Sequence, residues 1–424
     1  MIDKSRKHLI ILRLMALIIL FSLMKISYAQ QQPPEVQTPV RRELKLNLNE
    51  AIKIALQNNP GLMSAHYSVE QQDVLGKTAF DLGKTSIYYY KDNTPPSGNY
   101  EIGISQTISF PTVYLQQNSL QNQNISLSKK SYEAVKADLI KNVKLAYYQY
   151  AYGFERLKLF AYQDSIYGNF LKAAEIRYKT GETSKLERLT AQTKYQEVQL
   201  QMKQADADLS IYEKELQKFL NTVRPIELKD TTLELIRFDS TLVHPGIDNT
   251  AIKSNPLINL YKQKINVTEA EYGLEVNRLL PDISLGYSKL TNKSIFNFYS
   301  FQVGLSLPLW FLPQQGRIEA AAVGEKIAES DYQNFRILIQ SAYQQQLKEY
   351  QKLKEQINYY DTIGLKQADE ILKAAEANYG NGNIGYVEFV QDITQAIDIK
   401  TKYLDAINQY DKSIINLNYL LGSE

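Results

Sequence analysis

Apolar positions follow a helical spacing over long stretches of the chain. This spacing predicts helices over 114–179 and 184–220, and a shorter helical stretch over 48–82 that begins with Asn49 as its N-cap and is interrupted at Asn59 and Pro60. Within 184–220 the apolar residues fall at alternating steps of four and three, which is typical of helices packed side by side as in a coiled coil. At about 1.5 Å per residue, the longest stretch predicts a rod about 90–100 Å long.

Between the helical stretches the apolar period changes to two. Residues 100–110 and 301–310 each alternate apolar with small or polar side chains, and each follows a weaker strand pattern near 85–91 and 283–289. The apolar positions are Tyr100, Ile102, Ile104, Ile108, Phe110, Phe301, Val303, Leu305, Leu307 and Leu309. Strands of about ten residues with one apolar face suit a membrane barrel that has lipid outside and water inside.

The chain repeats this order of elements about 200 residues later. The segment 173–181 recurs at 374–382 with a constant shift of 201 residues, and the same shift carries Glu187 onto Glu388. Asn59 and Pro60 return as Asn255 and Pro256. A period this long indicates duplication of a whole structural half rather than a solenoid repeat.

Four strands cannot close a membrane barrel by themselves, because the smallest closed examples have about eight. An open edge in lipid would leave backbone groups without partners. Other copies of the chain must therefore complete the sheet. Three copies, a homotrimer, would give a 12-stranded barrel, and the same threefold symmetry would close the helices into a tunnel. The fold class is mostly α with a β-barrel portion.

The N-terminus is typical of a signal peptide, with Lys4, Arg6 and Lys7 before an apolar run and Ser27-Tyr28-Ala29 before Gln30. An uncleaved membrane anchor is the alternative. The predicted organisation is a signal peptide (1–29), a flexible N-terminus (30–45), a first repeat (46–225, with a strand hairpin at 84–110), a linker (226–246) and a second repeat (247–424, with a strand hairpin at 281–310).

Composition excludes several classes of function. The net charge is +2, from 48 basic and 46 acidic side chains, so no basic face for nucleic acid is indicated. The chain has no cysteine, which rules out disulfides and thiolate metal sites, and its three histidines lie far apart. Since the sequence contains no convincing nucleophile, phosphate loop or metal constellation, we expect neither an enzyme nor a cofactor.

Taken together, these features resemble the TolC family of outer-membrane efflux ducts. The resemblance rests on the segment 48–60, on Tyr178-x-x-Gly181 and Tyr379-x-x-Gly382 at the ends of the long helices, and on the paired strand hairpins. It implies a trimeric barrel in outer-membrane lipid, continued through the periplasm by a helical tunnel. It also implies a periplasmic adaptor and an inner-membrane pump of the resistance-nodulation-division type as partners.

The segments 307–309 and 315–321 look more like those of ducts that serve heavy-metal pumps than of ducts that serve drug pumps. The substrate class stays open between metal cations and drugs. The alternative function is an exported trimeric coiled-coil structural protein or adhesin, whose strand hairpins would form a soluble collar.

Threefold symmetry would turn a single pore-facing side chain into a ring of three. The candidate residues for a periplasmic gate are Glu187, Glu388 and Asp392, because the segment that follows each tip glycine would line the narrow mouth. The alternative is that these are ordinary solvated helix carboxylates. By resemblance, the adaptor contacts are the tip residues Thr180, Gly181, Glu182, Asn381, Gly382 and Asn383.

Overall fold

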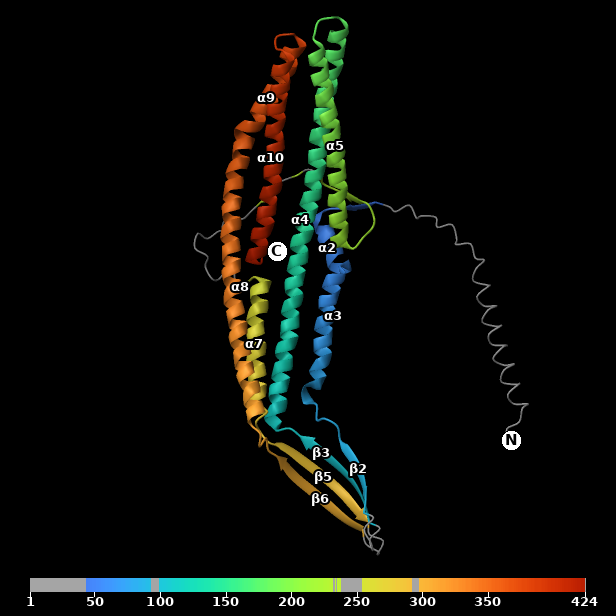
Figure 1. Cartoon of the computed structure of the whole chain (residues 1–424), viewed down its shortest axis with the longest axis vertical. Helices are drawn as coiled ribbons and strands as arrows, with labels where there is room; N and C mark the ends of the chain where they lie inside the picture. The colour runs from blue at the N-terminus through green and yellow to red at the C-terminus, as the bar shows by residue number, and fades with distance from the viewer. Residues whose placement is uncertain are drawn as a thin grey trace, which may run out of the picture. The chain divides into compact units, whose positions relative to one another are not determined.

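The computed structural model describes residues 43–92, 99–231, 233, 235–237, 254–291 and 297–423. The predicted signal peptide lies outside these residues, as do nearly all of the predicted flexible N-terminus and most of the predicted linker. Residues Leu44–Glu424 form one compact unit. In this unit long helices run side by side, and a four-stranded sheet lies at one end of them (Figure 1).

Each half contains a helical part, then a pair of strands, then a long helical hairpin. The first half consists of α2 (Leu48–Asn58), α3 (Pro60–Leu75), a 3-10 helix (Gly76–Phe80), β2 (Ser86–Lys91), β3 (Tyr100–Ile108), α4 (Pro111–Lys179) and α5 (Lys185–Leu220). The second half consists of α7 (Pro256–Asn277), β5 (Asp282–Thr291), β6 (Asn297–Ser306), α8 (Leu312–Tyr359), a π-helix (Tyr360–Gly364), α9 (Leu365–Gly380) and α10 (Tyr386–Leu421). The predicted long helices and strand pairs are confirmed.

The strands form one antiparallel sheet in the order β2-β3-β5-β6. Its register aligns Ile104 with Tyr287 and Tyr287 with Phe301, so apolar side chains form rows across one face. The adjacent row places Gly103 beside Ser288 and Ser288 beside Ser300 on the other face. β6 lies four residues earlier than the predicted strand over 301–310, because Pro308 has no N–H to donate to a strand ladder.

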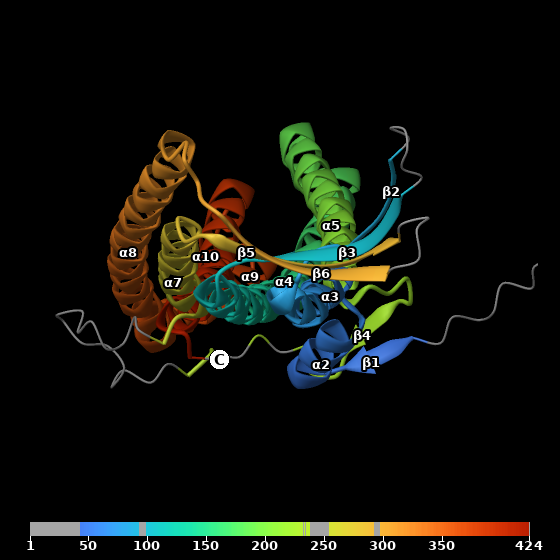
Figure 2. The same ribbon diagram turned by 90° about the horizontal axis from the view of Figure 1, so that it is seen from below.

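A second pair of strands was not predicted. β1 (Leu44–Leu46) pairs in parallel with β4 (Ile226–Leu228), in segments that the sequence indicated to be flexible or a linker. Each strand has only three residues, too few for an alternating pattern. Leu46 and Leu228 are buried in the same core as α2 and α4. Figure 2 shows helices α3, α4, α7 and α8 in an arc, with α2 and the β1–β4 pair on its convex side.

The predicted N-cap of the first helix is wrong by two residues. Asn47, not Asn49, caps α2: its side chain accepts a hydrogen bond from the N–H of Glu50 at 3.0 Å. Glu50 in turn accepts one from the N–H of Asn47 at 2.9 Å. This reciprocal capping box satisfies two backbone donors that a helix start otherwise leaves without partners.

An asparagine joins two helices end to end in each repeat. Asn255 accepts hydrogen bonds from the N–H groups of Leu257 and Ile258 at the start of α7. Its amide group donates to the carbonyls of Tyr419 and Leu420 at the end of α10. Asn59 does the same between α3 and the carbonyl of Phe219 in α5. The repeated Asn-Pro pair therefore places the start of one helix against the end of another: α3 against α5 in the first repeat, and α7 against α10 in the second.

Candidate functional site

The long helices end in two matching turns. Gly181 and Gly382 both have φ of +76°, a left-handed conformation that glycine adopts without steric cost. In the first turn the N–H of Glu182 donates to the carbonyl of Arg177 at 2.8 Å. In the second, the N–H of Asn383 donates to the carbonyl of Asn378 at 2.8 Å. The repeated glycine thus fixes two tips of the same shape.

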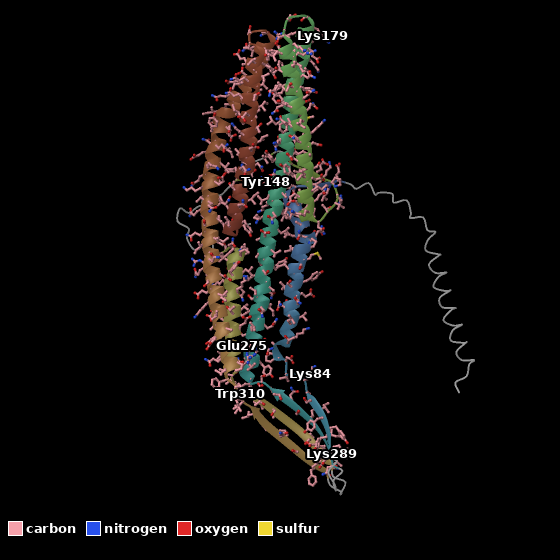
Figure 3. The ribbon with its side chains drawn as sticks, viewed as in Figure 1. Lys84, Tyr148, Lys179, Glu275, Lys289 and Trp310 are labelled. Atoms are coloured by element: carbon pink, nitrogen blue, oxygen red, sulfur yellow. The ribbon has the colours of Figure 1, made fainter. Side chains whose placement is uncertain are left out.

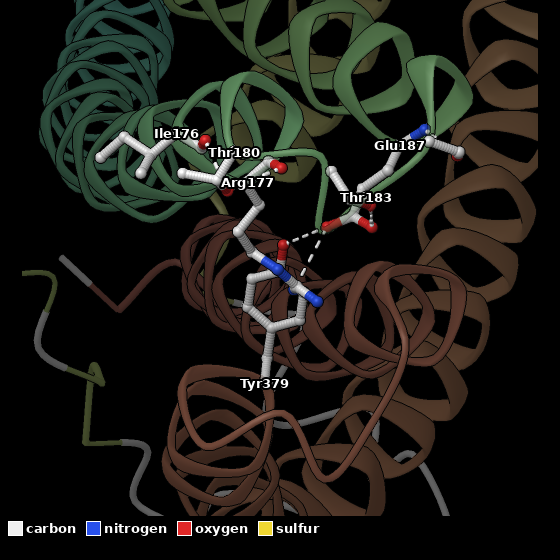
Figure 4. A network of polar contacts seen from close by, with 7 residues as sticks. Ile176, Arg177, Thr180, Thr183, Glu187 and Tyr379 are labelled. Atoms are coloured by element: carbon white, nitrogen blue, oxygen red, sulfur yellow. Dashed lines mark hydrogen bonds and ion pairs between the residues drawn. The ribbon is translucent and has the colours of Figure 1, made fainter.

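Glu187, in the first turn of α5, belongs to a polar network that joins the two tips. Ser184 caps α5 by accepting from the N–H of Glu187 at 3.3 Å. The Glu187 side chain is only 6% exposed. Its Oε1 lies 3.4 Å from the Arg177 Nη1 and accepts a hydrogen bond from the Tyr379 hydroxyl at 2.6 Å, while its Oε2 accepts one from Thr183. We call Arg177, Thr183, Glu187 and Tyr379 the tip network (Figure 4).

The tip network crosses from one repeat to the other, because Tyr379 belongs to α9 and the remaining members to the first tip. Burial raises the pKa of Tyr379, and its hydrogen bond to the anionic Glu187 raises it further. The hydroxyl therefore stays protonated and remains a donor. Arg177 also lies over the Tyr379 ring, 5.5 Å from its centroid. A charged donor, a neutral donor and the carboxylate thus hold the two hairpins together.

Aromatic rings pack against Tyr379 of the tip network. The rings of Tyr379 and Phe389 stack with centroids 4.5 Å apart, and Phe170 of α4 lies 5.1 Å from Phe389. Both phenylalanines are buried. Sequence reasoning missed them, although Phe389 directly follows the candidate Glu388. Their helical spacing is that of ordinary core positions, so no local signal distinguishes them.

The other two gate candidates lie apart from the tip network. Glu388 is exposed, and Asp392, one helical turn later, is half-buried. Among the described residues no side-chain hydrogen bond or ion pair reaches Glu388. Gly385 caps α10 without a side-chain hydrogen bond. The structure therefore does not bring the three predicted carboxylates together, and the interpretation of Glu187 as a solvated carboxylate is wrong because it is buried and paired.

Further polar contacts join α4 to α10 below the tips. The Tyr152 hydroxyl donates to Asp405, and Asn408 donates to Gln149 at 3.3 Å. Nearer the tips, the hydroxyls of Tyr167 and Thr394 lie 3.3 Å apart. The hairpins of the two repeats are thus joined at several levels.

At the other end, the sheet has one apolar and one polar face and two edges. On one face lie Ile87, Ile104, Tyr287 and Phe301, all exposed in the single chain. The edge strands β2 and β6 each pair on one side only within the described residues. None of the helices in the described ranges is both long and apolar enough to cross a membrane. No group of three histidine or acidic side chains among the described residues could hold a metal ion.

The fold and the repeated hairpins define a class of outer-membrane channel, and the family comparison agrees. The model of the family described as "Outer membrane efflux protein" matches residues 83–222 and 249–423. The chain belongs to this family and is an outer-membrane efflux channel with a periplasmic helical tunnel, not an enzyme. No curated protein sequence matches the chain.

Solved structures of outer-membrane channels share this fold. CusC is 17% identical, with a TM-score of 0.76 over 89% of this chain and 92% of that one. The channel CmeC of Campylobacter jejuni is 16% identical, with a TM-score of 0.77 over 89% of this chain and 85% of its own. MtrE of Neisseria gonorrhoeae, solved in its open state, is 16% identical, with a TM-score of 0.71 over 88% of each chain.

Proposed function

We propose that three copies of this chain close a 12-stranded barrel and a continuous helical tunnel. The observation that carries the proposal is the four-stranded sheet, apolar on one face, whose edge strands β2 and β6 could pair with the sheets of neighbouring copies. In lipid each unpaired backbone group would cost several kcal/mol, roughly, which favours closure. Channels of this family act as trimers with periplasmic adaptors and inner-membrane pumps.

Native mass spectrometry of protein extracted in detergent from outer membranes tests the trimer. A trimer whose channels conduct in planar bilayers supports the proposal. A monomeric or soluble species would overturn it, because an open four-stranded sheet cannot exist in lipid.

In this proposal the tip network holds the periplasmic mouth closed. Glu187 and Tyr379 tie the second hairpin to the first, so opening the mouth by moving one hairpin away from the other requires that their hydrogen bond breaks. The buried carboxylate favours this role, since separating it from its donors would leave a charge without compensation in a poorly solvated place. Glu187 thus acts as the holding residue of the gate rather than as a pore-facing charge.

Glu388 and Asp392 have a different role in the proposal. They lie on the first turns of α10, and the exposure of Glu388 leaves its charge free to act on passing ions. Threefold symmetry would make a ring of three Glu388 carboxylates, which raises the local concentration of cations. This would suit the export of cationic substrates, metal ions included, while the choice of substrate rests with the pump.

The two tip turns are the proposed adaptor contacts. Thr180, Gly181 and Glu182 on one side and Asn381, Gly382 and Asn383 on the other form short turns of equal geometry. Two like turns per chain would present six equivalent positions around a trimer. Exchanging both turns for unrelated loops that keep the glycines should abolish binding of the adaptor without affecting trimer insertion. Loss of the trimer instead would show that the turns serve folding.

A further inference from the structure

A pocket of about 430 Å³ lies between α4 and the elements that cover it, far from both the tips and the sheet. Its lining includes Leu48 and Asn49 at the start of α2, Tyr147 and Tyr148 of α4, and Asp230 after β4. Figure 3 places Tyr148 near the middle of the long helices. Since α2 and the β1–β4 pair lie on the convex side of the arc, the pocket belongs to the outer side of the helices (Figure 2). We call it the midpoint pocket.

The β1–β4 pair, which sequence reasoning did not predict, positions the rim of the midpoint pocket. The N–H of Lys229 donates to the carbonyl of Leu46 at 3.0 Å, which extends the pairing one residue past β4. The Lys229 ammonium lies 2.6 Å from the carboxylate of Glu50 in α2. Asp230, the next residue, is therefore held beside the start of α2, and its side chain is exposed.

Two tyrosines form one wall of the pocket. The rings of Tyr147 and Tyr148 meet edge to face, with centroids 5.8 Å apart. Tyr147 is buried and Tyr148 is half-buried. Burial raises the pKa of Tyr147, and the carboxylates of Asp230 and Glu50 raise it further. Its hydroxyl therefore stays protonated, and the wall combines aromatic surface with a neutral hydroxyl group.

The second repeat has no such aromatic pair. At the shift of 201 residues, Lys348 and Glu349 stand in place of Tyr147 and Tyr148. Lys348 is exposed and Glu349 is half-buried, so both are in contact with solvent. The long helix that both repeats share therefore forms without two tyrosines at this place. Packing of the long helices alone does not account for the aromatic wall of the midpoint pocket.

The chemistry of the lining suits an oligosaccharide. Sugar rings have apolar C–H faces that pack on aromatic rings, and edges of hydroxyl groups that need polar partners. Among the described lining residues, Asp230 is the only charged one, so the pocket favours a neutral ligand over an anion. Its carboxylate can accept hydrogen bonds from hydroxyl or acetamido N–H groups. Asn49 is exposed and can both donate and accept, because capping of α2 rests on Asn47.

The position of the pocket narrows the source of such a sugar. At about 1.5 Å per residue, α4 spans about 55 Å from Pro111 to Tyr148 and about 45 Å from Tyr148 to Lys179. Membrane lipids at the sheet therefore lie far out of reach. The helical tunnel runs through the periplasm, so it must cross the cell wall, whose glycan strands consist of N-acetylated amino sugars.

We propose that the midpoint pocket binds the N-acetylated glycan of the cell wall. Tyr148 provides the surface on which a sugar ring packs, and Asp230 and Asn49 provide its hydrogen-bond partners. Binding would hold the tunnel to the cell wall at the middle of its length. The inference uses the periplasmic position of the helices and does not depend on closure of the barrel.

The full chain in detergent is titrated calorimetrically with N-acetylchitotetraose, a soluble oligomer of N-acetylglucosamine, and is co-sedimented with purified cell-wall sacculi. We expect saturable binding of the oligosaccharide and retention on the sacculi. Tyr148→Leu keeps an apolar side chain without the ring, and Asp230→Asn removes an exposed charge, so each should weaken binding about tenfold or more. The matched controls Tyr162→Leu on α4 and Asp206→Asn on α5 change exposed side chains outside the pocket and should bind like the parent protein.

Several results would overturn the inference. The parent protein would show no saturable binding, or the pocket variants would bind as well as the controls, which would place the contact elsewhere on the chain. Maltotetraose lacks acetamido groups, so an affinity equal to that of N-acetylchitotetraose would rule out the cell-wall glycan as the occupant. If Tyr148→Leu and Asp230→Asn keep sugar binding but lose a purified periplasmic adaptor, the pocket is a protein contact. Native mass spectrometry of each variant reports on the trimer separately.

Discussion

The two repeats share one plan but differ in the course of their long helices. In the first repeat α4 runs unbroken from Pro111 to Lys179. In the second, a π-helix at Tyr360–Gly364 separates α8 from α9, and Figure 1 shows α9 displaced from the line of α8. A side chain at Gly364 would meet the Tyr360 ring at 2.9 Å and Ile399 at 3.4 Å. The two tips therefore have the same geometry, although the long helices that lead to them differ.

The repeats also differ in the chemistry of their equivalent carboxylates. Glu187 is buried and has three side-chain partners, whereas its repeat counterpart Glu388 is exposed. Conversely, Asp411 of the second repeat is fully buried, while its counterpart Ser210 is exposed. Equal positions in a duplicated chain thus have unequal surroundings: the carboxylate at the first tip is buried and paired, and the one at the second tip is exposed to solvent.

The largest effect on opening of the mouth is expected from Tyr379→Phe, which removes the hydroxyl that joins the repeats. A hydrogen bond to a charged group contributes about 1.5–3 kcal/mol, so the equilibrium between open and closed mouths should shift about tenfold or more toward open. Single-channel recordings in planar bilayers would show higher conductance or longer open times. Tyr178→Phe is the matched control, because Tyr178 is its repeat counterpart and is exposed. Equal behaviour of both variants would rule out the tip network as the closing device.

The next effect concerns the buried carboxyl of the second repeat. Burial raises the pKa of Asp411 to about 7, although the hydrogen bond from the N–H of Ile236 opposes the shift. As pH rises from about 4 to 7, the unfolded chain loses this proton while the folded chain keeps it. The free energy of unfolding should therefore fall by up to about 1.4 kcal/mol per pH unit and level off above pH about 7.

Asp411→Asn should remove this part of the pH dependence, because asparagine stays neutral and keeps an oxygen to accept from Ile236. The unfolding midpoint, followed by circular dichroism in detergent across this pH range, checks it. Ser210→Ala in the first repeat is the control and should leave the profile unchanged. A variant whose profile still matches the parent protein would show that other groups cause the dependence.

A smaller difference, in the free energy of unfolding, is expected between alanine variants of the two asparagines that join helices. Asn255 is 1% exposed and its side chain makes four hydrogen bonds, whereas Asn59 is half-buried and its side chain makes three. Asn255→Ala should lower the free energy of unfolding by about 2–3 kcal/mol, because it removes a helix cap and the side-chain donor to the Leu420 carbonyl. Asn59→Ala should cost about 1 kcal/mol. Thermal unfolding of both variants measures the difference, and a larger loss for Asn59→Ala would contradict this account.

Sequence reasoning reached those parts of the fold whose signal is local or repeated. The long helices follow from apolar spacing, and the matching tips follow from the glycine that recurs at the 201-residue shift. It could not reach contacts between distant segments. Glu187 finds its donor Tyr379 192 residues later, and Lys45 on β1 meets Glu227 on β4 182 residues later. Residue type and spacing leave Glu187 open between a gate residue and a solvated carboxylate, and only the packing of the two hairpins shows that it is buried.

The smallest effect is expected from Glu388→Gln. The charge of Glu388 is exposed, and salt at physiological concentration screens exposed charges over about 8–10 Å. The change in cation preference should therefore be modest at low ionic strength and vanish at about 1 M salt. Reversal potentials across a salt gradient measure it. Glu182→Gln, which removes the same charge from the exposed first tip, is the control. If both variants lower the cation preference equally, overall tip charge sets the preference. If neither conductance nor preference changes in Glu388→Gln, this carboxylate does not act on ions in the mouth, and the difference between the repeats lies in the holding contact alone.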